Sequence, residues 1–440
     1  MTVPSIKTEL PGPEARKYIE MSREYEPGSM SEQVPAVWRK AQGVVVEDVD
    51  GNTFIDFSSG VLVTNVGHCH PKHVAAIQEQ AAELMNSYDF VNPWRARLAK
   101  KLVQITAPNL DKAFILSTGA EAVESAIKVA RRYTGKYEII AFHGAFHGRT
   151  YMSMSVGGKS GIKKHFGPMV PGVLFAPFCY CYRCVFEQKF PECDYTCLRY
   201  LDSVLDTESA GSVAALITES YQGAAGSIIP PGDYMQRLKR WCEERDIIFI
   251  LDEVQSSFGR TGRMFAYEHW GIQPNLLCLG KGIGSGVPIS ALLGESRILD
   301  SLEPGSMSST NGGNPLCARA ALAAIEIMEE EKLADRSDDL GAKMLDRLNA
   351  MMKKYEMIGD VRSMGLVAGV EIVTDKKSKQ PDSAMTRRII RESFERGLIM
   401  IAPIGFYGNV IRIAPPLVIP EDLLMKGLDI IEESVKTLTS

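Results

Sequence analysis

The chain has 440 residues, more than the length at which one hydrophobic core usually stops growing, so two domains are expected. An apolar content of 45%, a charged content of 23% and a net charge of −5 argue against a nucleic-acid binder or a membrane-surface binder. No apolar run reaches transmembrane length, and the N-terminal stretch lacks the pattern of a signal peptide. Nine cysteines in so long a chain predict reduced thiols rather than a disulfide framework, so a cytoplasmic protein is expected.

Residues 43–57 predict a β-hairpin, because two β-rich runs flank the turn sequence Asp50-Gly51-Asn52. From about residue 100 to 295, short apolar runs alternate with helical patterns. The runs are typical of strands buried on both faces of a sheet, and they cover residues 113–116, 138–142, 214–219, 247–252, 276–279 and 289–293. Residues 121–133 have the apolar spacing of a helix. This alternation predicts an α/β architecture with a mostly parallel sheet.

The C-terminal third of the chain has a different pattern. A long helical pattern covers residues 315–354, and the tail indicates a small α+β unit with strands near 367–372 and 410–413 and helices near 383–396 and 420–438. We therefore expect a large central α/β domain over residues 61–320. A smaller domain is expected to combine residues 1–60 with residues 321–440.

Lys281 and Asp252 give the strongest chemical signal. Asp252 ends a short apolar run and Lys281 follows another. Ligands bind at the carboxyl ends of strands in open α/β sheets, so both side chains are expected in one crevice. Lysine can form a Schiff base with an aldehyde, and a carboxylate facing a pyridine nitrogen keeps that nitrogen protonated. The pair is typical of a pyridoxal 5'-phosphate (PLP) site. The alternative for either residue alone is a solvated lysine or an aspartate in a turn.

Residues 117–121 (Ser-Thr-Gly-Ala-Glu) lie at a predicted strand-to-helix junction. Glycine there lets a phosphate approach the backbone, and the helix N-terminus offers free N–H groups and a positive dipole end. The alternative is an ordinary helix cap by Ser117 or Thr118.

Three further segments each have two interpretations when taken alone. An aromatic side chain in residues 142–149 (FHGAFHGR) either stacks on a flat ring or simply packs. The Gly-rich residues 309–315 form either a binding turn or an ordinary helix start. Arg412, between two isoleucines, is either a partly buried cation that needs an anionic partner or an edge-strand arginine facing water.

The five segments, in this order and spacing, resemble the class-III aminotransferases. This family includes ornithine and 4-aminobutyrate aminotransferases, dialkylglycine decarboxylase and some amino-acid racemases. The resemblance extends from about Leu10 to the C-terminus and is most specific at DEVQSSFGRTG, Lys281, STGAEAVESAIKVAR and IRIAPPLVIPED. It implies PLP fold type I, which agrees with the α/β prediction, and a homodimer with active sites at the subunit interface.

The resemblance also implies roles around the cofactor ring. Lys281 is implied to be the Schiff-base lysine, and Asp252 the partner of the pyridine nitrogen. Gln255 is implied to contact the ring hydroxyl oxygen, and Phe146 to stack on the cofactor face.

The phosphate and substrate roles follow in the same way. Gly119 and Ala120 are implied to bind phosphate through backbone N–H groups, and Thr310 to complete that phosphate site from the other subunit. Arg412 is implied to bind a substrate carboxylate.

The sequence departs from the family at two positions. Many relatives have Glu-Pro-x-Gln-Gly-Glu where this chain has residues 219–224 (ESYQGA), so Ala224 replaces a glutamate that pairs with the carboxylate-binding arginine in ω-aminotransferases. Without it, Arg412 is expected to prefer an acid group in every bound state, because an unpaired buried arginine costs several kcal/mol. Val61 stands where dialkylglycine decarboxylase has a glutamine that contacts the scissile carboxylate, which disfavours decarboxylation.

Four cysteines form a cluster in the sequence, Cys181, Cys184, Cys193 and Cys197. Paired thiols at this spacing can bind zinc tetrahedrally. The alternative is a loop with reduced, partly buried thiols, which the family chemistry also allows.

The leading functional prediction is an aminotransferase that moves an amino group from an amino donor to a 2-oxo acid such as pyruvate or 2-oxoglutarate, by a ping-pong mechanism. Lys281 is expected to carry the proton between substrate and cofactor. The alternatives are an amino-acid racemase or epimerase, a decarboxylating transaminase of the dialkylglycine type, and a non-catalytic PLP-fold protein.

Overall fold

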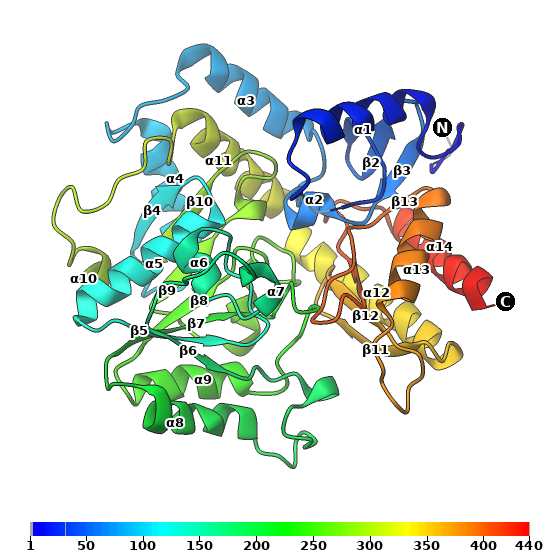
Figure 1. Ribbon diagram of the computed structural model, residues 1–440. Helices are drawn as coiled ribbons and strands as arrows, with labels where there is room; N and C mark the ends of the chain where they lie inside the picture. Colours follow the sequence, from blue (N-terminus) through cyan, green and yellow to red (C-terminus); the bar gives the residue numbers. More distant parts are fainter. Residues whose placement is uncertain (1–2, 31, 440) are drawn as a thin grey trace. The chain divides into compact units, whose positions relative to one another are not determined.

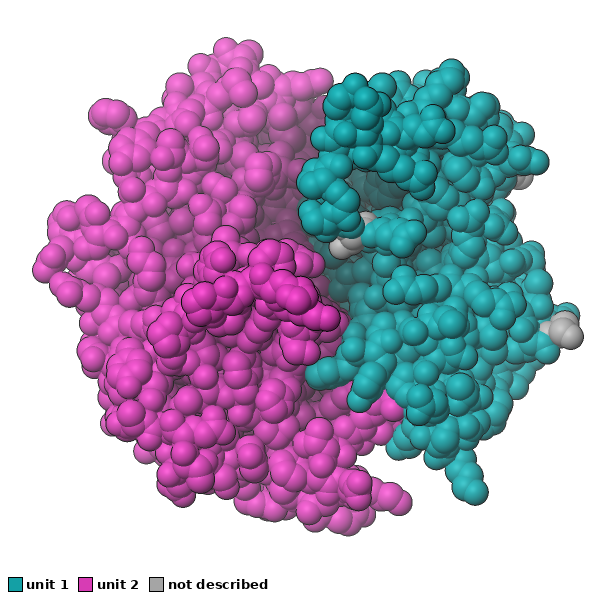
Figure 2. Space-filling model, viewed as in Figure 1, with its two compact units in different colours: residues 1–71, 260–262, 331–440 teal, residues 72–259, 263–330 magenta. Residues whose placement is uncertain are grey.

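The computed structural model describes residues 3–30 and 32–439 (Figure 1). The chain divides into two compact units, which are described separately (Figure 2). Unit 1 consists of Met1–Pro71, Arg260–Gly262 and Glu331–Ser440, and unit 2 of Lys72–Gly259 and Arg263–Glu330. The domain boundaries expected after residues 60 and 320 stay a prediction.

Unit 2 is built on a seven-stranded sheet with the strand order β4-β10-β9-β8-β7-β5-β6. The strands are β4 (Lys112–Leu116), β5 (Glu138–Phe142), β6 (Val173–Ala176), β7 (Val213–Glu219), β8 (Ile248–Asp252), β9 (Leu276–Leu279) and β10 (Ser290–Gly294). Only β10 runs antiparallel to its neighbours β4 and β9. The predicted α/β fold with a mostly parallel sheet is therefore confirmed.

Helices cover both faces of this sheet. Figure 1 shows α5 on one face and α8 and α9 on the other. The helices and 3-10 turns of unit 2 are α3 (Pro71–Glu83, whose first residue lies in unit 1), α4 (Pro93–Ile105), α5 (Gly119–Thr134), α6 (Tyr151–Ser155), α7 (Ser160–Lys163), η1 (Cys181–Arg183), α8 (Thr196–Glu208), α9 (Tyr234–Glu243), η2 (Ala266–Trp270), η3 (Lys281–Ile283), α10 (Ser296–Leu299) and α11 (Pro315–Glu330). Every residue of β5, β7, β8, β9 and β10 is buried, as expected for strands covered on both sides.

Unit 1 contains a four-stranded sheet in the order β1-β2-β3-β13 and a three-stranded sheet in the order β11-β12-β14. Its elements are α1 (Pro13–Tyr25), β1 (Trp38–Gln42), β2 (Val45–Asp48), β3 (Thr53–Asp56), α2 (Ser59–Leu62), α12 (Leu333–Lys354), β11 (Ile358–Ser363), β12 (Ala368–Ile372), α13 (Ser383–Glu395), β13 (Leu398–Ile399), β14 (Val410–Ile413) and α14 (Glu421–Thr439). The hairpin predicted over residues 43–57 is confirmed as the antiparallel pair β2 and β3.

Arg260 connects the parts of unit 1 that come from the two ends of the chain. Its fully buried guanidinium donates hydrogen bonds to the Leu366 carbonyl at 2.9 Å, the Pro415 carbonyl at 2.6 Å and Asn65 Oδ1 at 2.8 Å. Charge-assisted bonds from one side chain thus join segments distant in the sequence, in addition to the backbone pairing between them.

The helical pattern over residues 315–354 forms two helices, α11 and α12, rather than one. The backbone breaks at Lys332, which is left-handed with φ +48°. Glu329 and Glu330 lie at the end of α11, where acidic side chains oppose the helix dipole.

Candidate active site

A cavity of about 200 Å³ lies at the carboxyl edge of the unit 2 sheet. Its lining residues come from five loops and strand ends, and they are Gly119, Ala120, Phe146, His147, Gly148, Glu219, Ala224, Asp252, Val254, Gln255 and Lys281. Parallel strands end at the same edge, so residues far apart in the sequence meet there. The sheet topology thus explains why the predicted residues of unit 2 converge.

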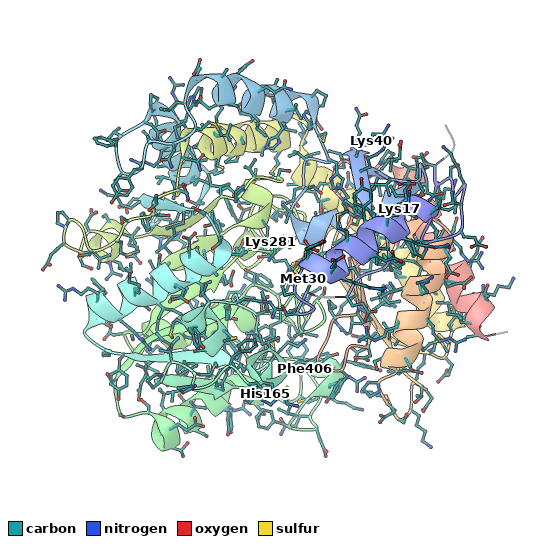
Figure 3. The ribbon with its side chains drawn as sticks, turned by 45° about the horizontal axis from the view of Figure 1, so that its top comes forward. Lys17, Met30, Lys40, His165, Lys281 and Phe406 are labelled. Carbon is teal, nitrogen blue, oxygen red and sulfur yellow. The ribbon has the colours of Figure 1, made fainter. Side chains whose placement is uncertain are left out.

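Lys281 and Asp252 both line this cavity, as the sequence predicts. Asp252 is the last residue of β8, and Lys281 begins η3 one residue after β9, the next strand of the sheet. Lys281 is labelled in Figure 3. Lys281 is left-handed with φ +46°, which is uncommon for a residue with a Cβ. An amine and a carboxylate therefore face one small space, which is the arrangement a pyridine aldehyde needs.

His147 holds Asp252 in place, and the sequence analysis did not single it out. Its Nδ1 lies 2.7 Å from Asp252 Oδ2, and Asp252 Oδ1 accepts the backbone N–H of Val254 at 3.0 Å. His147 is buried, and within the described ranges its Nε2 has no hydrogen-bond partner. The sequence feature that could have indicated a role for His147 is its position after a strand, in the same loop as Phe146.

The N-terminus of α5 forms one wall of the cavity. Thr118 caps the helix, because its Oγ1 accepts the N–H of Glu121 at 3.2 Å and the Glu121 carboxylate accepts the N–H of Thr118 at 2.8 Å. A Cβ on Gly119 would lie 2.7 Å from a methyl carbon of Val254, so packing requires glycine there. The ordinary cap and the phosphate site are compatible, because the cap leaves the first-turn N–H groups of Gly119 and Ala120 without an acceptor inside the helix.

Gln255 and Phe146 line the remaining walls. The Tyr221 hydroxyl donates to Gln255 Oε1 at 3.2 Å. Phe146 is half-buried, and the Arg149 guanidinium lies 5.7 Å from its ring centre. A hydrogen-bonding amide and an aromatic face are thus available to a flat polar ring.

Three predicted residues lie elsewhere. Thr310 is exposed in the loop before α11, outside the cavity lining. Arg412 is buried on β14 of unit 1, with 5% of its surface exposed. Val61 is 40% exposed in unit 1, in a left-handed turn with φ +69°, a strained conformation for a β-branched side chain. The roles of all three stay predictions.

The clustered cysteines line a second, small cavity of unit 2. Cys181, Cys184, Cys193 and Cys197 meet there, together with Cys179. Burial raises the pKa of Cys181 and raises that of Cys197 to about 12, and the neighbouring thiols act in the same direction. Across the described part of the chain, no group of three or more His, Cys, Asp or Glu residues is arranged to hold a metal ion. The structure thus gathers the four thiols around one cavity, and of the two alternatives for them it favours partly buried, reduced thiols over a zinc site.

Comparison with known proteins gives the same class of protein as the geometry. The fold and the cavity are those of a fold-type-I PLP enzyme. The family Aminotransferase class-III matches residues 28–435, and the chain belongs to this family. It is therefore a PLP-dependent class-III aminotransferase.

The most similar relatives include proteins of two activities. The chain is 37% identical to a 4-aminobutyrate aminotransferase of Mycobacterium tuberculosis, over 97% of this chain and 96% of the relative. It is 38% identical to a leucine/methionine racemase of Thermococcus litoralis, over 94% of each. Among solved structures, an ornithine aminotransferase of Toxoplasma gondii with partial occupancy of PLP at its active site has a TM-score of 0.86 and 30% identity, covering 97% of this chain and 95% of that one.

The residues of the cavity fit PLP. Lys281 offers an amine for the aldehyde, and Asp252 a carboxylate for the ring nitrogen. The N-terminus of α5 offers N–H groups for the phosphate.

Proposed function

We propose that this enzyme transfers the amino group of an α-amino acid to a 2-oxo acid in two half-reactions at one site. The observation that carries the proposal is the placement of Lys281, Asp252 and Ala224 in one cavity. When bound, PLP supplies an electron sink for the substrate's α-carbon. Lys281 Nζ would move the proton to and from that carbon, while Asp252, held by His147, keeps the ring nitrogen protonated.

The nature of the donor is inferred from the cavity wall. Ala224 contributes a methyl group where ω-aminotransferases of the family have a glutamate. Arg412 is proposed to bind the substrate carboxylate through a bidentate pair. Position 224 carries no carboxylate that would compete with a substrate for the Arg412 guanidinium, so we expect substrates with an acid group next to the reacting carbon.

An amino-donor screen tests this proposal. Purified enzyme with PLP is supplied with α-amino acids or ω-amino acids, and with pyruvate or 2-oxoglutarate as acceptor. The product amino acid and the visible spectrum of the cofactor are measured. An α-amino acid should be turned over repeatedly only when a 2-oxo acid is present, and turnover limited to ω-amino donors would refute the proposed donor class.

Ala224→Glu tests the specificity argument, with Ala224→Gln as a neutral control of similar size. The new carboxylate should raise the specificity constant for an ω-amino donor relative to an α-amino donor, and should weaken 2-oxo-acid binding. The glutamine variant should not. An unchanged ratio, or the same ratio in both variants, would show that position 224 does not face Arg412.

Racemisation is the second candidate, favoured by the 38% identity to a leucine/methionine racemase. A racemase would convert one enantiomer of an amino acid into the other without any 2-oxo acid. Chiral chromatography of a single-enantiomer substrate incubated with holoenzyme alone separates the two activities.

We also propose that the enzyme is a homodimer. The segment between α3 and α4 exposes apolar side chains, including Phe90 at 79% and Val91 at 88%. Asn86, in the same segment, donates to the Thr310 carbonyl at 3.5 Å and to Asn311 Oδ1 at 3.1 Å, so the Thr310 loop lies beside this apolar surface. Sedimentation of the native protein tests this state.

A reducing compartment is proposed as well. All nine cysteines are free, as in a cytoplasmic protein. In addition, no helix among the described residues is long and apolar enough to cross a membrane.

A further inference from the structure

Glu219 is a buried carboxylate that lines the cofactor cavity, and the proposed reaction gives it no role. It is the last residue of β7 and pairs in register with Asp252 of β8. On its other side, β7 pairs with β5, whose following loop carries Phe146 and His147. Glu219 thus lies between Asp252 and the Phe146 loop along the sheet edge that forms the cavity.

Each oxygen of Glu219 accepts a backbone N–H from a different loop. Oε1 accepts the N–H of Phe146 at 3.0 Å, and Oε2 accepts the N–H of Gly223 at 3.0 Å. The first loop presents the aromatic ring that is predicted to stack on the cofactor. The second continues into Ala224, the position proposed to select the substrate.

The Gly223 loop lies directly on Gln255. A Cβ at Gly223 would lie only 1.9 Å from Gln255 Oε1, so no side chain fits between them. Interiors this closely packed transmit small shifts. Movement of Gly223 would therefore displace Gln255, which is predicted to contact the ring hydroxyl of the cofactor.

The charged or titratable side chains that interact with Glu219 are Asp252, His147 and Lys159. They come from β8, from the loop after β5 and from the residue before α7. Burial raises the pKa of Glu219 to about 7, Asp252 acts in the same direction, and His147 opposes them. Lys159 Nζ donates to the Ala224 carbonyl at 3.4 Å. Burial lowers the pKa of Lys159, while Glu219 raises it.

We propose that the ionised carboxylate of Glu219 is a positioning group, which clamps the Phe146 loop and the 223–224 loop in the geometry that binds cofactor and substrate. This inference rests on the proposed function. Two N–H donors need two acceptor oxygens, so protonation of one oxygen weakens the clamp. Cofactor affinity and kcat should therefore fall as the pH decreases through about 7.

Glu219→Gln is the main test, because it keeps the shape but replaces one acceptor oxygen with an NH₂ group that cannot accept a hydrogen bond. Glu253→Gln is the matched control. Glu253 is also a buried carboxylate with its pKa raised to about 7, and it accepts N–H groups of Ala266 and Tyr267, but it does not line the cavity. The two substitutions should change stability to a similar degree, because both carboxylates are buried and have similar pKa values.

Only Glu219→Gln should change the site. We expect its PLP dissociation constant, measured by titration of the apo-protein, to rise about 10-fold or more, because a buried donor loses its acceptor. Its kcat should fall, and the decrease below pH 7 that is expected of the wild type should disappear. Glu253→Gln should keep wild-type cofactor affinity and the wild-type pH profile.

The outcomes separate this inference from the proposed function. If the wild type transfers no amino group, the proposed function fails, and the PLP titration still tests the clamp. If Glu219→Gln keeps wild-type cofactor affinity and acid dependence, the clamp is refuted while the proposed function stands. If Glu219→Gln does not fold, Glu219→Asp is used, which keeps the charge but shortens the reach. It should weaken PLP binding and retain the acid dependence, and wild-type PLP affinity in this variant would also refute the clamp.

Discussion

Replacement of Asp252 by Asn tests the central electrostatic claim about the cavity. The amide has nearly the same shape, and its oxygen can still accept either the Val254 N–H or the His147 Nδ1–H. The substitution removes the negative charge that is proposed to keep the pyridine nitrogen protonated. We therefore expect PLP to stay bound, because Lys281 and the α5 N-terminus are unchanged, and the proton-transfer step to slow.

The size of the effect follows from the placement of this charge. Asp252 is buried, with 5% of its surface exposed, so solvent screens it little. An opposite charge at contact distance shifts a pKa by about 1 to 3 units, and each unit corresponds to about 1.4 kcal/mol. Loss of the charge should therefore slow the step by roughly 10-fold to 1000-fold.

Single-turnover kinetics measures this step directly. Holoenzyme is mixed with an excess of an α-amino acid without any 2-oxo acid, and the decay of the cofactor's visible band is followed. Cofactor content and melting temperature, measured in parallel, separate a slow step from a lost cofactor. A variant that retains PLP and converts it at the wild-type rate would refute the role of Asp252.

Three other predictions concern single residues. Lys281→Ala should abolish the Schiff base, seen as loss of the visible band and of borohydride-reducible PLP, and a reducible adduct with wild-type turnover would contradict the assignment. Arg412→Ala should raise KM for a 2-oxo acid by about 10-fold or more, because a charge-assisted pair is lost, and an unchanged KM would exclude it from acceptor binding. Glu253 has a folded-state pKa of about 7, above its ordinary value of 4.5, so its contribution to stability is full below pH 4.5 and is lost as the pH rises through 7. On the order of 3 kcal/mol of unfolding free energy should be lost over this range. Denaturant titration at several pH values measures this dependence, and Glu253→Gln should flatten it. A variant whose unfolding free energy depends on pH as in the wild type would refute the raised pKa of Glu253.

Local patterns predicted the secondary structure of unit 2 well, because its strands are buried on both faces and appear as short apolar runs. All six predicted runs coincide with strands to within one or two residues at each end. The parallel strand β6, although it is also a short apolar run, and the short helices of the loops were not predicted. The break at Lys332 was also missed, because neither glycine nor proline marks it.

The resemblance to the class-III aminotransferases, together with their places at strand ends, predicted the roles of Lys281, Asp252, Gly119 and Ala120 from the sequence. The tertiary structure decided what supports them. His147 orients Asp252, Glu219 joins two loops, and Arg260 connects distant segments of unit 1. Sequence order shows which residues are present in each loop. Hydrogen bonds between loops depend on which strands become neighbours, and only the folded sheet, in the order β8-β7-β5, brings Asp252, Glu219 and the Phe146 loop into one row.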